Sequence, residues 1–284
     1  MGAAFIVALR EGIEAALIVS ILLAYLRQLG RRDRAHLVWW GTALAVAISA
    51  AVATVIFALG GEFEGVGEQV FEGLVTLTAV SVLTWMIFWM RRQGGRIRSD
   101  LQDKVDSALL TGGLALAALA FTAVLREGVE TSLFLYAAAK GTAVDAGGVG
   151  GQMVGAFLGL ALAVVGGVLL YRGGIRMNLR TFFRVTGSIL IVVAAGLLAF
   201  SVHELQEAGW LSFFTSTAFN LSATLPDDHG VGTVLHGLIG YNADPSLLEV
   251  FSWVGYLVVV ATLYFRPRSA VAPRIAPAIE RSDV

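Results

Sequence analysis

The stretch "LREGIEAALIV", residues 9–19, places Arg10, Glu11 and Glu14 within a run that otherwise has the composition of a membrane helix. Apolar residues extend from residue 3 to residue 26, which is long enough for one crossing of a bilayer. Each charge at the centre of such a span costs about 2.5–3.5 kcal/mol even on insertion scales that give low values. Three charges in one span therefore indicate a functional site.

The same pattern occurs a second time, 116 residues later, in "LREGVETSLFLY" at residues 125–136. In each copy of this REGxE motif the arginine and the second acid are four residues apart, so they can pair along one helix face. The two acids are three residues apart, close enough to share one ion. The glycines allow another helix, or the shell of an ion, to approach closely. The motif residues are Arg10, Glu11, Gly12 and Glu14 in the first copy, and Arg126, Glu127, Gly128 and Glu130 in the second.

The composition around the two motifs is that of a membrane protein. Of the 284 residues 57% are hydrophobic and 14% charged, with a mean hydropathy of +0.77. The chain has no cysteine, which excludes disulfides, thiolate metal sites and thiol redox chemistry. A net charge of −1 without a basic patch argues against nucleic acid as a partner. Because no basic segment precedes the first apolar run, we expect no cleaved signal peptide.

Apolar stretches predict seven membrane spans, near 3–26, 37–60, 70–90, 107–138, 150–171, 185–202 and 249–265. Of the 20 lysines and arginines, 17 follow spans 1, 3, 5 and 7, whereas Lys140 alone lies on the opposite side. Short cytoplasmic connections collect basic residues, so the N-terminus is expected outside and the C-terminus in the cytoplasm. We therefore expect an all-α, multi-pass domain over residues 1–266 in the plasma membrane, with a disordered cytoplasmic tail over 267–284.

The two motif copies run through the membrane in opposite directions, because span 1 enters from outside and span 4 from inside. Many transporters build a substrate site near the bilayer midplane between such inverted repeats. The repeats here would be spans 1–3 and 4–6, with span 7 added. Outside the motif the two halves do not align clearly, so this prediction depends on topology and the motif.

Together the two motifs form a candidate metal site. The four carboxylates of Glu11, Glu14, Glu127 and Glu130 face two guanidiniums, which leaves an excess of two negative charges for a multivalent cation to offset. Oxygen ligands suit ferric iron, but also calcium, magnesium or manganese. Two alternatives remain open: a structural lock between spans 1 and 4, and acid–base catalysis, for which no nucleophile or hydrolase motif accompanies the acids.

A second group of acids precedes the third span. Glu68 and Glu72 are four residues apart at its outer end and face the same way. Because acids on an outer face concentrate cations, these two can relay a metal inward. The alternative is that these acids only cap the helix at the membrane interface.

A third group follows the sixth span. His203 and Glu207 have a spacing that can hold a metal, and Glu204 lies between them. We expect these residues to extend the outer relay. The alternative is an amphipathic segment lying in the membrane interface, anchored by its aromatic residues Trp210, Phe213 and Phe214.

The order of these motifs resembles the high-affinity iron permeases, which comprise oxidase-dependent iron transporters of fungi and EfeU-type bacterial relatives. The resemblance covers residues 1 to about 265. It consists of the two REGxE motifs in the first and fourth spans, "EGVGEQVFEG" at 64–73, "HELQEAGW" at 203–210, and "LHGLIGYNADPSLLEVFSWVGYL" at 235–257.

The resemblance implies that the chain is a transporter and not an enzyme, with iron as its substrate and no resident cofactor. It assigns iron translocation to Glu11, Glu14, Glu127 and Glu130, with Arg10 and Arg126 as their partners. It also implies separate extracytoplasmic iron-binding, peroxidase-like or oxidase components. A permease for another divalent metal such as manganese, and a membrane iron sensor or receptor, remain as alternatives.

Overall fold

The computed structural model describes residues 2–93, 97–141, 148–172, 179–227 and 230–266, and this part of the chain is almost entirely helical. It contains no β-strand, only an isolated bridge between Thr217 and Ser246. The expected tail over 267–284 lies outside the described residues. The helices are α1 (Gly2–Gln28), the short 3-10 helix η1 (Arg32–Arg34), α2 (Ala35–Glu62), α3 (Val66–Gln93), α4 (Ile97–Thr111), α5 (Gly113–Gly141), α6 (Gly148–Tyr171), α7 (Leu179–Glu207), α8 (Gly230–Ile239) and α9 (Leu247–Phe265).

Within the described ranges, five helical segments are long and apolar enough to cross a membrane: Arg32–Glu62, Val66–Arg91, Gly150–Tyr171, Thr181–Glu207 and Leu247–Phe265. The chain is therefore a membrane protein. The two motif helices, α1 and α5, are not among the five, although they have 27 and 29 residues. Each carries an arginine and two glutamates near its middle, and these charged residues lower the mean hydropathy of the helix.

The span predicted over 107–138 is wrong at its start. Helix α4 ends at Thr111, and α5 begins at Gly113. Between them Gly112 has φ of +131°, a conformation that side chains other than glycine rarely adopt. The apolar sequence continues across this break, so hydropathy alone does not reveal it. The other six predicted spans each lie within one helix.

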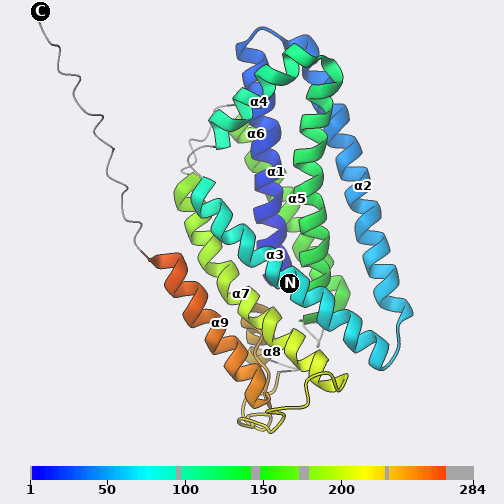
Figure 1. The fold of residues 1–284 in the computed structure, drawn as a ribbon, viewed down its shortest axis with the longest axis vertical. Coiled ribbons are helices and arrows are strands. Elements are labelled where there is room, and N and C mark those ends of the chain that lie inside the picture. Colours follow the sequence, from blue (N-terminus) through cyan, green and yellow to red (C-terminus); the bar gives the residue numbers. More distant parts are fainter. Residues whose placement is uncertain (1, 94–96, 142–147, 173–178, 228–229, 267–284) are drawn as a thin grey trace, which may run out of the picture.

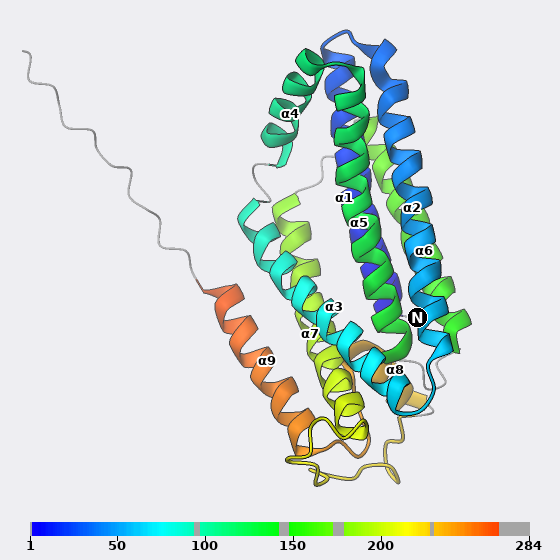
Figure 2. The same ribbon diagram turned by 45° about the vertical axis from the view of Figure 1, so that its right-hand side comes forward.

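The long helices form two groups (Figures 1 and 2). In the first, α6 packs on α1, α1 on α5, and α5 on α2. In the second, α3 packs on α7 and α7 on α9, and this group is tilted against the first. Helix α3 also contacts α5, so the motif helix α5 of the first group faces the second group.

The strongest helix contacts connect the two halves of the chain. Helix α1 packs most extensively on α6, and α5 on α2. If α1–α3 is superimposed on α5–α7, α1 corresponds to α5 and α2 to α6. The pair α1–α6 then corresponds to the pair α5–α2. Both contacts use a glycine: a Cβ atom at Gly159 of α6 would lie 2.6 Å from the carbonyl oxygen of Phe5, and one at Gly41 of α2 would overlap the carbonyl of Ala117. Backbones thus approach closely, as is common between membrane helices.

Helix α4 covers the end of the bundle where α1 meets α2, at the top of Figure 1. Its buried face consists of Leu101, Val105 and Ala108. These side chains pack into a cluster with residues of α1, α2 and α5, namely Leu22, Leu26, Val38, Leu116 and Ala120. We call this the basic end of the bundle, because Arg27, Arg31, Arg32 and Arg34 lie there, where α1 meets α2. The opposite end, where α2 meets α3, is the acidic end.

Candidate metal site between the motif helices

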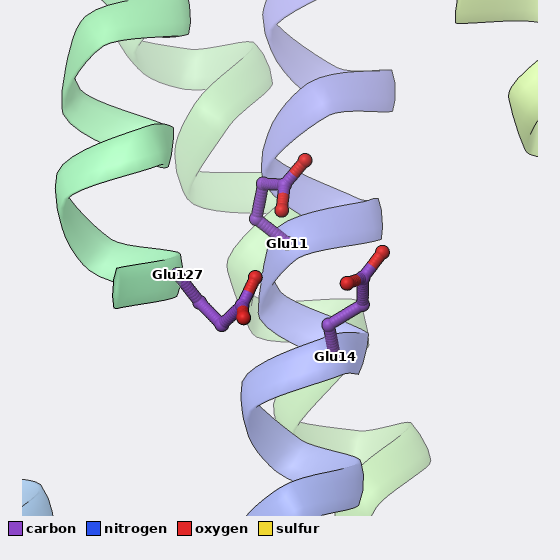
Figure 3. A group of neighbouring side chains, drawn as sticks. All are labelled: Glu11, Glu14 and Glu127. Carbon is purple, nitrogen blue, oxygen red and sulfur yellow. The ribbon is translucent and has the colours of Figure 1, made fainter. Parts of the chain in front are cut away.

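The two REGxE motifs meet where α1 packs on α5. Glu11, Glu14 and Glu127 each present a carboxylate oxygen, and these three atoms lie within 4.8 Å of one another. Figure 3 shows Glu127 extending from α5 toward the two acids of α1. All three residues are at most 5% exposed. In the sequence Glu127 lies 116 residues after Glu11 and 113 after Glu14, and the fold brings the three acids together in the interior.

Arg10 is paired with acids of its own helix. Its Nη1 lies 2.7 Å from Glu11 Oε1 and its Nη2 lies 3.0 Å from Glu14 Oε1. Nη1 also donates to the sulfur of Met86 on α3, at 3.1 Å. The residue is only 1% exposed. Arg10 therefore neutralises one charge of the α1 pair inside the bundle and connects this pair to α3.

Arg126 occupies a different environment. Its Nε donates to Glu130 Oε1 at 2.8 Å and lies 3.9 Å from Glu127 Oε1. The guanidinium stacks over Trp89 and Trp85 of α3, with 4.6 Å and 5.2 Å to the ring centroids. One third of this side chain is exposed. Glu130 is oriented toward Arg126, and it does not belong to the group of three converging acids.

Several carboxylate oxygens of the site have no hydrogen-bond partner in the part of the chain that the structure describes. They are Glu11 Oε2, Glu127 Oε2 and Glu130 Oε2, and all are buried. A buried carboxylate oxygen without a donor or cation is strongly unfavourable, since it has lost its hydration. A multivalent cation would compensate these charges, and the all-oxygen donor set suits a hard one.

The motif glycines lie against neighbouring helices. A Cβ atom at Gly12 would be 2.7 Å from Ala163 Cβ on α6, and one at Gly128 would be 2.6 Å from Ser49 Cβ on α2. The hydroxyl of Ser132, one turn beyond Gly128, also donates to the Ser49 carbonyl oxygen at 3.2 Å. Of the two roles that the sequence left open for these glycines, the close approach of a helix is the one seen here.

A pocket of about 290 Å³ adjoins the site from the basic end. Glu14, Glu127 and Arg126 line it at the site, and Asp100 and Lys104 of α4 line it on the other side. Glu14 and Glu127 are thus the two members of the group of three acids that line this pocket.

The acids predicted as an outer relay lie at the acidic end, on neighbouring helices. Both acids of α3 are ion-paired with Lys140 of α5: its Nζ is 3.3 Å from Glu68 Oε1 and also contacts Glu72 Oε1. Glu204 of α7 lies beside them, because a Cβ atom at Gly73 would be 3.4 Å from Glu204 Cβ. These acids do not form a second group of three converging ligands among the described residues.

His203 and Glu207 pair at 3.3 Å, as their spacing permits, and Gln69 of α3 donates to Glu207 at 2.8 Å. The other ring nitrogen of His203 lies 3.1 Å from Glu249 of α9. Sequence reasoning missed Glu249. Its signal is a capping box, in which Ser246 and Glu249 bond each other's backbone at the start of α9. This network joins α7 to α9.

The aromatic residues after α7 are exposed. Trp210, Phe213 and Phe214 are each more than half accessible. Their segment is held against the start of α9, where Leu248 N donates to the Phe214 carbonyl oxygen at 3.2 Å. Exposed aromatic rings at this end agree with an interfacial segment.

Long apolar helices around a buried group of carboxylates define a membrane protein with acids gathered in its interior. Comparison with known families identifies the kind: residues 1–275 match the Iron permease FTR1 family, and the chain belongs to it. The members of this family are transporters and not enzymes.

Several relatives are similar over nearly the whole chain. The ferrous iron permease EfeU of Escherichia coli O6:K15:H31 (strain 536 / UPEC) is 42% identical over 271 residues, which cover 94% of this chain and 96% of the relative. The ferrous iron permease EfeU of Yersinia pestis is 38% identical over 278 residues, covering 96% and 97%. A 42% identical relative from Escherichia coli K12 is named a putative inactive ferrous iron permease EfeU. No solved structure matches the chain.

Proposed function

We propose that this chain is an iron permease that imports iron across the plasma membrane through the site between its two REGxE motifs. The observation that carries the proposal is the convergence of Glu11, Glu14 and Glu127 in the interior, with buried oxygens that lack partners. Glu130 serves as the fourth acid when its contact with Arg126 opens. Arg10 and Arg126 limit the repulsion between the acids while the site is empty.

In this proposal α1 and α5 also cross the membrane, which gives seven spans with the N-terminus outside and the C-terminus in the cytoplasm. Three features support it: the length of these helices, their place between apolar helices, and the distribution of basic residues. The corresponding pairs α1–α6 and α5–α2 support an inverted repeat of α1–α3 and α5–α7, with α9 added. The membrane domain comprises residues 1–266.

Iron enters at the acidic end and leaves at the basic end. On entry it passes the outer relay, Glu68, Glu72, His203, Glu204 and Glu207, and on leaving it passes the pocket beside Glu14 and Glu127. The names of the relatives favour ferrous iron as the carried form. We propose separate extracytoplasmic iron-binding, peroxidase-like or oxidase components as the partners that supply iron at the acidic end.

The test is flux into sealed vesicles that contain only this protein. Radiolabelled iron is supplied either as ferrous ion with a reductant or as a ferric chelate, and manganese is added as a competitor. We expect saturable uptake of one iron form, with manganese competing weakly. Binding without uptake would favour a receptor, and equal uptake of manganese would favour a general divalent-metal permease.

A further inference from the structure

Among the lysines and arginines, Lys140 is the only one that the sequence places at the acidic end. There it contacts two particular acids. Its Nζ contacts the carboxylates of both Glu68 and Glu72, although these belong to α3 and Lys140 to α5. Glu72 is 6% exposed, so its pairing with Lys140 takes place largely away from water, whereas the Glu68 side chain is 42% exposed. Lys140 itself is 29% exposed in its side chain and can withdraw toward solvent.

The acids near Lys140 outnumber it. Glu204 lies beside Glu72 at the close contact of α3 with α7, and its carboxylate interacts electrostatically with those of Glu72 and Glu68. One ammonium therefore faces three carboxylates, and His203, the neighbour of Glu204 on α7, also interacts with Glu204. The formal excess is two negative charges with a neutral His203 and one with a protonated His203. An ammonium on a flexible four-carbon stem is a compact point charge and can occupy the position of a small cation.

We propose that Lys140 is the resident cation of the outer relay and sets its selectivity by valence. This inference rests on the proposed function, because it assigns a role to the relay through which iron enters. An ion that enters must displace the ammonium from Glu68 and Glu72. Because the lysine is tethered, its local concentration is high, and a monovalent ion offers the acids no greater charge in exchange. A divalent or trivalent ion provides two or three times the Coulomb attraction at the same distance, so it displaces the lysine.

The displaced ammonium would repel the metal from the outer side. Lys140 and Tyr136 are one turn apart on α5, and the ring of Tyr136 is packed between Phe57 and Phe71. The base of the lysine is therefore held in place while its end moves. The same residue then excludes monovalent ions before entry and opposes the return of a metal ion after entry.

The inference is tested by replacing Lys140 with methionine, which keeps the length and removes the charge. Purified full-length protein in vesicles is assayed for iron uptake at several NaCl concentrations. We expect Lys140→Met to lower KM for iron by roughly tenfold, equivalent to about 1.4 kcal/mol, with kcat retained. Sodium chloride should raise KM more steeply in the variant, because sodium then replaces lysine as the ion to be displaced.

The matched control is Arg27→Met, which removes one exposed positive charge at the basic end of α1; its KM and salt dependence should equal those of the wild type. If Lys140→Met does not reach the membrane, Lys140→Gln is measured instead. An unchanged or higher KM in the lysine variant, beside normal uptake by the wild type, would overturn the inference alone. Absence of uptake by the wild type would instead contradict the proposed function.

Discussion

Arg10 pairs with Glu14 along its own helix, with 3.0 Å between Nη2 and Glu14 Oε1. The spacing in the sequence allows this pairing or a pairing across to α5, and both ion pairs of Arg10 among the described residues are with α1. The acids of α1 are thus held by their own arginine inside the bundle. Glu127 of α5 completes the group without a comparably close basic partner, since its contact with Arg126 is 3.9 Å.

This arrangement predicts unequal effects for the two motif arginines. Arg10→Gln leaves Glu11 and Glu14 buried without a cation, a change that typically costs about 3–5 kcal/mol. Arg126→Gln should cost much less, because one third of that side chain is accessible. The melting temperatures of the purified variants measure the difference. Equal melting temperatures would contradict the structural asymmetry of the two motifs.

The motif glycines should be sensitive to a single added methyl group. Gly12→Ala and Gly128→Ala introduce contacts of 2.7 Å and 2.6 Å with atoms on α6 and α2, and overpacking of this kind costs about 1–3 kcal/mol. Gly166→Ala on α6 is the matched control, since no atom lies within 4 Å of the added Cβ. Thermal unfolding in detergent should separate the two motif variants from the control. A control as unstable as the motif variants would show that helix packing is not the cause.

The pocket beside Glu14 and Glu127 should carry iron toward the basic end. Ala123 lines it, and Ala123→Trp would fill much of its 290 Å³ volume. We expect the variant to lose most of its uptake rate while its equilibrium affinity for iron remains near that of the wild type. Val258→Trp, on the exposed face of α9, controls for an added indole. Uptake at the normal rate in Ala123→Trp would exclude this pocket as the route.

The sequence predicts the long helices well, because each consists of an apolar run near the length of a membrane span. It also predicts the pairing of arginine with the second acid of each motif, which depends only on helical spacing. The break at Gly112 escapes prediction because the apolar sequence continues through it. The packing of α1 on α6 depends on glycines such as Gly159, whose partners lie far along the chain.

Within the site, the sequence identifies the acids but not their geometry. The four motif acids look equivalent in the sequence, yet Glu130 lies apart from the other three. It pairs with Arg126, whose guanidinium stacks on Trp85 and Trp89. The pairing of Lys140 with Glu68 and Glu72 also connects different helices. Such contacts follow from tertiary packing, which local spacing does not contain.

The most direct test of the central claim is iron uptake by vesicles that contain Glu127→Gln. This change keeps the shape of the side chain and removes the charge that α5 contributes to the group with Glu11 and Glu14. Asp103→Asn, at an exposed position of α4, is the charge-matched control. We predict that Glu127→Gln lowers kcat/KM for iron by roughly 100-fold or more, equivalent to about 2.7 kcal/mol, while the control transports normally. Uptake by Glu127→Gln with the rate and affinity of the wild type would contradict the assignment of this site.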